Sequence, residues 1–227
     1  MVRLVSVALV VLLTGVTARA SPWYVTWTGD AYPETEGWTR YSSDPPAERW
    51  LEDGKLWIDS RAAWGMSDEY GQLRPGEMTL VPGEIFTMHW RVRVDFVYGE
   101  ASADAGVWVW TDDQRAAFFT MGMDAIHSEY ESGNWASFEP GVFHDFTFAS
   151  ADMLTYALWI DGVLSLQGAF HESLFDMPGM GWGDVSTDRS LSEWDAVDAG
   201  VTPEPSGVLC ILIALCVWRP LRRLGAR

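Results

Sequence analysis

The sequence has very little cysteine and few basic residues. Its two cysteines, Cys210 and Cys216, both lie near the C-terminus, which leaves residues 21–202 with none. No disulfide can form within that region, so its stability has to come from the burial of apolar side chains. Residues 21–202 carry nine basic and 31 acidic side chains, a net charge of −22. Such a charge repels nucleic acid, and we therefore expect no nucleic-acid partner.

The sequence also lacks the short motifs of several common catalytic sites. It has no Gly-x-Ser-x-Gly elbow and no phosphate-binding loop. The four histidines are scattered and do not form the helical pair that zinc peptidases use. These histidines are His89, His127, His144 and His171. No segment of residues 21–202 has a convincing helical period, which argues against a helical fold.

The first 20 residues have the pattern of a secretory signal peptide. Arg3 gives a basic start, and residues 4–16 form an apolar core. Ala18 and Ala20 occupy the small-residue positions of a cleavage site. We therefore expect a signal peptidase to remove residues 1–20 during export.

Residues 203–227 form a second signal. An apolar run over residues 207–218 is followed by four arginines and preceded by a short motif of Pro203, Glu204, Pro205 and Ser206. The two prolines should keep the motif out of helices and sheet ladders. A basic end is typical of the cytoplasmic side of a membrane. A comfortable spanning helix needs about 20 residues. Because the apolar run of residues 207–218 is shorter than this, we expect a short transmembrane helix.

This tail resembles the PEP-CTERM sorting signal of diderm bacteria, which membrane proteases of the exosortase class recognise. The resemblance covers about the last 25 residues. It implies export through the inner membrane, a transient C-terminal anchor and processing by an exosortase-like protease. The final location would then be the cell surface or the extracellular matrix. An ordinary short C-terminal anchor is the alternative.

The region between the signals, residues 21–202, is predicted to be one all-β domain. Its clearest strand covers residues 84–97, where apolar and polar residues alternate as in a sheet with one face on a core. Three hairpins are expected, over residues 50–59, 106–122 and 154–166. Many short strands with regular turns are typical of an antiparallel β-sandwich or jelly roll.

Three stretches of this domain resemble the closing part of concanavalin A-like lectin/glucanase domains and of the laminin-G-like jelly rolls in bacterial surface proteins. They are residues 156–164, 181–184 and 193–195. In that superfamily two antiparallel sheets stack, and the concave sheet often holds sugar. The resemblance implies the fold, and it makes extracellular polysaccharide the expected partner.

Two tryptophans are candidates for glycan binding. Trp108 and Trp110 alternate with valines, so both indoles should project from the same face of a strand. If that face is open, the rings can stack on pyranose sugars. If it meets the other sheet, they belong to the core.

A second candidate is the cluster of His89, Arg91 and Arg93, which share one face of the 84–97 strand. If Tyr98 and Tyr130 approach it, such a cluster would suit a polysaccharide lyase. The alternative is a polar, outward face on a strand whose other face is in the core.

Hydrolysis would require a pair of carboxylates on one strand face. The sequence Glu193-x-Asp195-x-x-Asp198 approaches the Glu-x-Asp-x-x-Glu pattern of jelly-roll glucanases, and a bulge could bring its third member onto the face of the first two. Its last residue is one methylene too short for the proton donor. We therefore expect no catalytic residues, with a jelly-roll glycan hydrolase or lyase as the alternative function.

For metals, Asp184, Asp188, Asp195 and Asp198 offer oxygen ligands without the spacing of a known calcium loop. We expect no required cofactor, and Asp184 and Asp195 are the candidate ligands if Ca²⁺ binds. The sequence thus predicts an exported, non-catalytic protein that binds or packs with extracellular polysaccharide. A structural envelope protein without a ligand is a further alternative.

Overall fold

The computed structural model describes residues 23–62, 65–97, 105–174, 176–185 and 189–203. The expected signal peptide with Ala18 and Ala20, most of the sorting motif (Glu204, Pro205 and Ser206) and the apolar run lie outside these residues. Among the residues described, no helix has the length and apolar character needed to cross a membrane.

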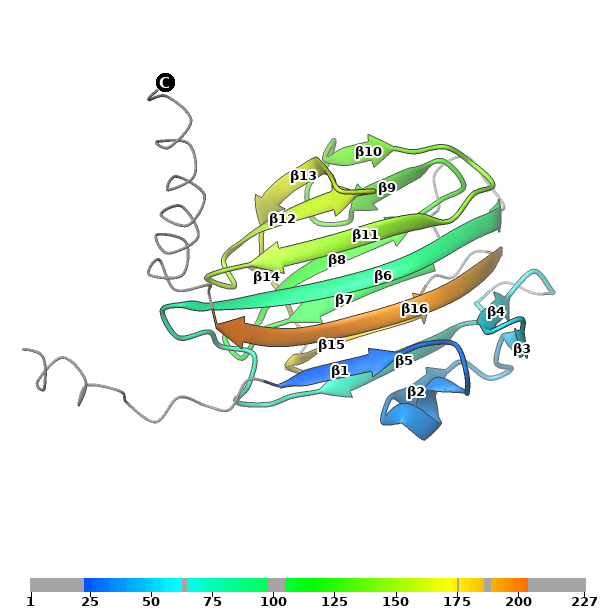
Figure 1. Cartoon of the computed structure of the whole chain (residues 1–227), viewed down its shortest axis with the longest axis horizontal. Helices are drawn as coiled ribbons and strands as arrows, with labels where there is room; N and C mark the ends of the chain where they lie inside the picture. The colour runs from blue at the N-terminus through cyan, green and yellow to red at the C-terminus, as the bar shows by residue number, and fades with distance from the viewer. Residues whose placement is uncertain (1–22, 63–64, 98–104, 175, 186–188, 204–227) are drawn as a thin grey trace, which may run out of the picture.

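The described residues form two stacked antiparallel sheets (Figure 1). The strands of sheet A are β1 (Tyr24–Trp27), β3 (Glu48–Glu52), β4 (Lys55–Asp59), β6 (Glu84–Val97), β11 (His144–Ser150), β12 (Thr155–Ile160), β13 (Val163–Ala169) and β16 (Ser190–Pro203). Their order is β13-β12-β11-β6-β16-β4-β3, with β1 also paired to β16.

The strands of sheet B are β2 (Thr39–Ser42), β5 (Asp68–Leu73), β7 (Ala105–Trp110), β8 (Arg115–Met121), β9 (Ala125–Ser128), β10 (Trp135–Ser137), β14 (His171–Glu172) and β15 (Gly179–Asp184). Their order is β10-β9-β8-β7-β15-β5-β2, with β14 paired to β8. A short 3-10 helix, η1 (Pro33–Glu36), precedes β2. The predicted all-β sandwich is therefore confirmed.

Alternation and turn chemistry placed β6 and the three expected hairpins correctly. Strand β6 has the predicted bounds, and its apolar positions from Phe86 to Val94 are buried. The three expected hairpins form as β3–β4, β7–β8 and β12–β13. The first and last of them turn through Asp-Gly pairs with positive φ at both residues, the conformation that a tight two-residue hairpin requires.

The core lies between the sheets and is rich in indole rings. Trp182 of β15 is fully buried at its centre, with ring centroids 4.8 Å from Trp194, 4.9 Å from Tyr70 and 5.1 Å from Trp27. Aromatic pairs of this kind add about 0.5–1.5 kcal/mol each beyond the area they bury. These contacts join strands of both sheets, which holds the sandwich together in a domain without cysteine.

The prediction that Pro203 stays outside any sheet ladder is wrong. Strand β16 runs beside β6 to its last residue, and Pro203 lies opposite Glu84. A proline is tolerated here because the strand ends at this position, so its missing N–H interrupts no further rung. The chain therefore leaves the domain from the end of a long, well-paired strand.

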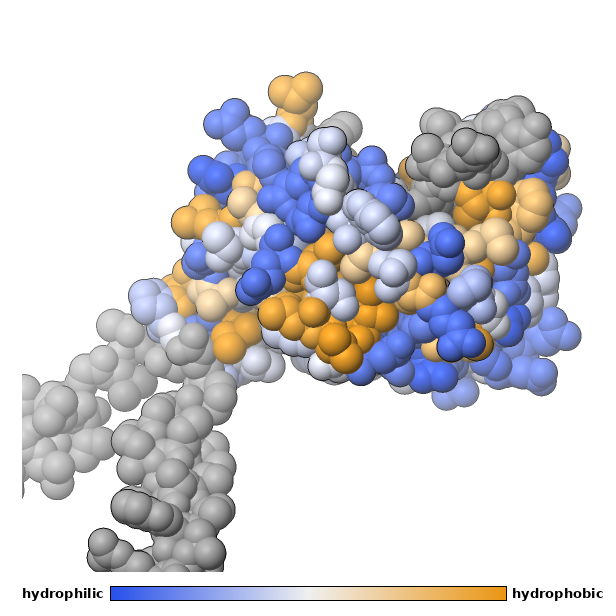
Figure 2. All heavy atoms as spheres, turned by 90° about the horizontal axis from the view of Figure 1, so that it is seen from above, coloured by the Kyte–Doolittle hydropathy of each residue, from blue (hydrophilic) through white to orange (hydrophobic). Residues whose placement is uncertain are grey.

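The outer edge of sheet A is covered in part by side chains of the connection between β9 and β10. Asn134 donates to the carbonyl oxygen of Gln167 (3.2 Å), and Glu131 accepts from the N–H of Ala169 (2.9 Å). These bonds occupy backbone groups of β13 that would otherwise be open to another strand. Apolar side chains gather over this edge in the space-filling view (Figure 2), and Val163 and Leu164 are 67% and 48% exposed.

Candidate functional site

The five residues predicted to bind glycan lie on opposite sides of the sandwich. His89, Arg91 and Arg93 alternate with the buried residues of β6, so they point outward from sheet A. Trp108 and Trp110 alternate with the core residues of β7, so they point outward from sheet B. The structure therefore does not bring the two groups together, and each face is a separate candidate site.

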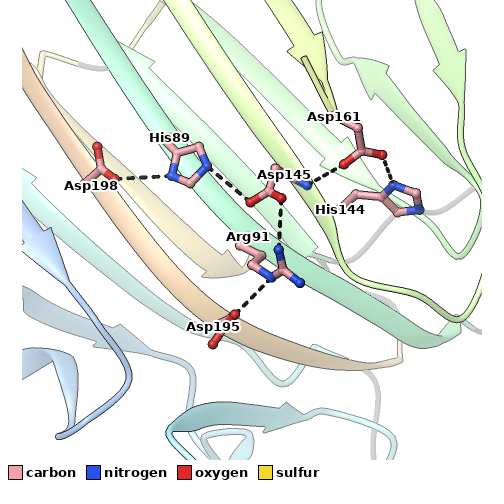
Figure 3. A network of polar contacts seen from close by, with 7 residues as sticks. All are labelled: His89, Arg91, His144, Asp145, Asp161, Asp195 and Asp198. Carbon is pink, nitrogen blue, oxygen red and sulfur yellow. Dashed lines mark hydrogen bonds and ion pairs between the residues drawn. The ribbon is translucent and has the colours of Figure 1, made fainter. Parts of the chain in front are cut away.

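The outer face of sheet A carries a chain of ion pairs across three strands (Figure 3), and we call it the ionic face. The His89 Nδ1 lies 3.2 Å from Asp198 and its Nε2 lies 3.4 Å from Asp145. Asp145 also binds the Arg91 Nη1 at 2.9 Å, and the Arg91 Nε lies 2.9 Å from Asp195. Every charge in this chain thus has an opposite charge beside it.

A second histidine extends the network to the β12–β13 turn. The His144 Nδ1 lies 2.7 Å from Asp161, whose other oxygen accepts from the N–H of Asp145 at 3.0 Å. The remaining nitrogen of His144 is 2.7 Å from the carbonyl oxygen of Glu139. These contacts fix the turn against β11 and position Asp145 for its two cationic partners.

The three carboxylates of the glucanase-like pattern do share the ionic face. A bulge in β16 between Trp194 and Ala196 changes the register against β6. As a result Glu193, Asp195 and Asp198 all reach cations on the outer side of β6. The sequence argument for a bulge is confirmed, but the carboxylates are engaged rather than free.

Glu193 illustrates why this arrangement is unsuited to hydrolysis. Burial raises the pKa of Glu193, as a proton donor would need, yet its side chain is only 7% exposed. The Arg93 Nη2 lies 2.6 Å from it and the Lys55 Nζ lies 3.8 Å away. A glycosidase acid has to reach the glycosidic oxygen with its proton, and Glu193 cannot do so behind these partners.

The lyase cluster is not assembled by the described residues. Tyr98 lies outside them, and Tyr130 stacks on His171 beside sheet B, with ring centroids 5.8 Å apart. Arg91 and Arg93 instead lie over the ring of Phe143, at 5.5 and 5.3 Å from its centroid. The guanidinium groups of Arg91 and Arg93 are therefore engaged by carboxylates of the ionic face and by this ring.

Stability should depend on pH through His89. The hydrogen bond to Asp198, together with the charges of Asp198 and Asp145, raises the pKa of His89 above its usual value. Its contribution is therefore fully present below about pH 6.5 and is lost as pH rises through the higher pKa of the folded state. Urea unfolding should show that the advantage of wild type over His89→Gln shrinks from about pH 6 to about pH 9.

The expected difference is below about 1 kcal/mol because the three side chains are partly exposed to solvent. His127→Gln is the matched control, since His127 lies on the other sheet. Equal pH dependence of wild type and His89→Gln would show that His89 is not held in this way.

Trp108 lies flat on sheet B in space that two glycines leave open. A Cβ at Gly181 would lie 2.2 Å from Cζ2 of Trp108, and a Cβ at Gly71 would lie 2.9 Å from the same atom. The indole Nε1 donates to Glu69 at 3.3 Å, and the residue is only 4% exposed. The prediction that Trp108 offers a free stacking surface is therefore wrong, although its indole is on the outer face.

Trp110 is the outer ring of this pair. Its centroid lies 4.2 Å from that of Trp108 with the planes 25° apart, and Trp110 remains partly exposed. Trp108 thus lies between Trp110 and the sheet, where Gly181 of β15 and Gly71 of β5 leave room for its indole. Of the two predicted tryptophans, Trp110 is the more exposed.

Two further aromatic stacks lie on the same face, which we call the aromatic face. They are Trp135 on His127, with centroids 6.2 Å apart, and Tyr130 on His171. Pairing across the sheet places His171 in the row of Trp110, and Trp135 with His127 in the row of Gly106. The sequence analysis missed Trp135, which at 55% is the most exposed tryptophan of the described residues.

The predicted calcium ligands do not meet. Asp184 is fully buried on β15 and accepts from the hydroxyl of Ser190 at 3.1 Å, whereas Asp195 pairs with Arg91 on the ionic face. Asp188 lies outside the described residues. Within the ranges that the structure describes, no three His, Cys, Asp or Glu side chains gather in a way that could hold a metal ion.

The domain therefore is a sandwich of two antiparallel sheets, with ion pairs across the outer face of sheet A and aromatic rings on the outer face of sheet B. No protein-family model matches the sequence, and no curated protein matches it either.

Several solved structures share the fold. A carbohydrate esterase of a Shiga toxin-encoding bacteriophage has a TM-score of 0.56 and 12% identity, with 78% of this chain and 97% of that chain covered. Peanut lectin has a TM-score of 0.55 and 8% identity, with 81% and 98% covered. A sialidase has a TM-score of 0.54 and 9% identity, with 80% of this chain and 19% of that chain covered. At these identities the likeness concerns the fold.

Proposed function

We propose that the domain is a non-catalytic module that binds extracellular polysaccharide through its aromatic face. The observation that carries the proposal is the supported ring of Trp110. A pyranose presents a flat C–H surface that suits an indole face. Because Trp110 packs on Trp108, which itself packs on β15 and β5, little side-chain freedom is lost when a sugar stacks on Trp110. The lectin named among the structures of the same fold supports this reading.

The absence of a usable acid–base pair on the ionic face supports a binding rather than a hydrolytic role. The carboxylates of Glu193, Asp195 and Asp198 each have a cationic partner within 3.8 Å. The ionic face then serves mainly to hold β16, β6 and β11 together, and the ligand belongs on the other side.

The first prediction concerns Trp110. Trp110→Ala should weaken binding in a glycan array of residues 21–202 by about tenfold or more, which corresponds to about 1.4 kcal/mol. Trp110→Phe should keep most of the affinity because it retains a flat ring. Trp57→Ala is the control, because Trp57 stacks on Trp50 in sheet A. A well-folded domain that binds no glycan would favour a purely structural envelope protein.

We further propose that the tail delivers the domain to the cell surface or the extracellular matrix. Support comes from the order of its parts, a Pro-Glu-Pro-Ser motif, an apolar run and a basic end. Signal peptidase and an exosortase-like membrane protease would be partners during export. Calcium would be an optional ligand that this function does not need.

Replacing Glu204 or deleting residues 219–227 should leave the protein in the inner membrane. The substitution would remove the charged residue of the recognition motif, and the deletion would remove the arginines that hold the apolar run in place. Cell fractionation with an antibody against residues 21–202 measures the outcome. Unchanged arrival of both variants at the surface would contradict the sorting proposal.

A further inference from the structure

We infer that the ligand is an extended, uncharged polysaccharide chain that crosses the three aromatic stacks, and not a single sugar at a chain end. This inference rests on the proposed function, which needs only one ring at Trp110. Three features of the aromatic face carry it: the spacing of the stacks, their support and the sign of the charges around them.

The stacks are too far apart for one sugar to touch. Trp110 and His171 belong to one row and are separated by β8, so two strand spacings of about 4.8 Å lie between them. The row of His127 and Trp135 crosses β8 at Thr120, four residues from Ala116. At about 3.3 Å per residue this adds about 13 Å along the sheet. Only a chain of several sugars can contact all three stacks.

Each stack presents a supported ring. Trp110 rests on Trp108, Trp135 on His127 and Tyr130 on His171, with interplanar angles of 25°, 24° and 28°. Trp135 and Tyr130 are 55% and 36% exposed. Rings held in this way offer contact area at a low cost in conformational entropy. The same type of stack occurs three times on this face, as a repeating ligand would require.

The charges around the stacks favour an uncharged chain. Glu129 accepts a hydrogen bond from Thr120 in the row of Trp135, and Glu131 lies 3.4 Å from His171. The arginine of this region, Arg115, is paired with Asp113 at 3.2 Å. Carboxylates can accept hydrogen bonds from sugar hydroxyls, whereas they repel uronates and sulfates. The net charge of −22 on residues 21–202 acts in the same direction.

The experiment uses two series of probes with residues 21–202. Soluble neutral glucans, mannans and galactans are compared with alginate and hyaluronate, and each neutral glycan is then tested as a disaccharide, a hexasaccharide and a polymer. The variants are Trp110→Ala, Trp135→Ala and Tyr130→Ala. Tyr24→Ala is the control, because Tyr24 is 60% exposed on sheet A. Tyr24, Trp135 and Tyr130 are exposed and Trp110 is partly exposed, so the variants should fold, which circular dichroism checks.

We expect binding to neutral chains only, with affinity rising from disaccharide to hexasaccharide. Each variant of the aromatic face should weaken polymer binding by about five- to tenfold, and Tyr24→Ala should not. If Trp110→Ala alone weakens binding and length has no effect, the extended site is wrong while the proposed function stands. If alginate or hyaluronate binds and neutral chains do not, the ligand class is wrong. If no glycan binds, the proposed function itself fails.

Discussion

Gly181→Ala should remove most glycan binding although Gly181 itself touches no ligand in this proposal. The new Cβ would lie 2.2 Å from Cζ2, 2.3 Å from Cε2 and 2.7 Å from Nε1 of Trp108. The indole cannot stay flat on the sheet, and Trp110 loses its support when Trp108 moves. We expect a loss of affinity of at least tenfold and, by the usual cost of overpacking, a loss of stability of about 1–3 kcal/mol.

Glycan titration and urea unfolding of the same samples separate the two effects. Gly122→Ala is the matched control, since its new Cβ would approach nothing closer than the carbonyl oxygen of Ala125 at 3.8 Å. If Gly181→Ala binds glycan and unfolds like wild type, Trp108 does not pack against Gly181. The binding site would then consist of the exposed rings without support from Trp108.

The glycines of β15 also show a limit of prediction from the sequence. Alternation located β6 because its outward positions are polar and its inward positions apolar. In β15 the outward positions are Gly179, Gly181 and Gly183, which carry no side chain to mark a face. Alternation therefore identifies neither β15 nor β5, which pairs with it, as a strand.

The same limit explains the different outcomes for Trp108 and Trp110. Both were predicted to point the same way, and they do. Both lie opposite a glycine of β15, and what separates them is the next strand, where Gly181 pairs with Gly71 but Gly179 pairs with Leu73. Register between strands distant in the sequence depends on long-range packing, which a local pattern does not reveal. Exposure of an individual indole therefore could not be derived from its own neighbours.

For the carboxylates of β16, the sequence predicts their shared face but not their partners. Their spacing correctly indicated a bulge and a shared face, because both follow from the period of a strand. Their pairing with Arg91, Arg93 and His89 depends on β16 lying beside β6. Residue types suited to catalysis were thus visible in the sequence, while the contacts that engage them were visible only in the fold.

Asp68→Ala should cause the largest loss in the free energy of unfolding, because Asp68 is fully buried and joins the two sheets. The Nε and Nη2 of Arg40 on β2 lie 2.6 and 2.9 Å from its two oxygens, and the Nε of Arg49 on β3 lies 3.8 Å away. Strand β2 belongs to sheet B and β3 to sheet A, so this carboxylate is shared between cations from both layers.

Asp68→Ala would remove the carboxylate that binds Arg40 through two hydrogen bonds, whereas Arg49 would keep Glu34 at 2.6 Å. Removing one partner of a buried ion pair costs about 3–5 kcal/mol, and urea unfolding at neutral pH should show a loss of that size. Asp59→Ala is the control, because its partner Arg61 is 44% exposed and such surface pairs contribute at most about 1 kcal/mol. A loss below about 1 kcal/mol in Asp68→Ala would mean that water or other carboxylates replace Asp68, and that the tryptophan core alone holds the sheets together.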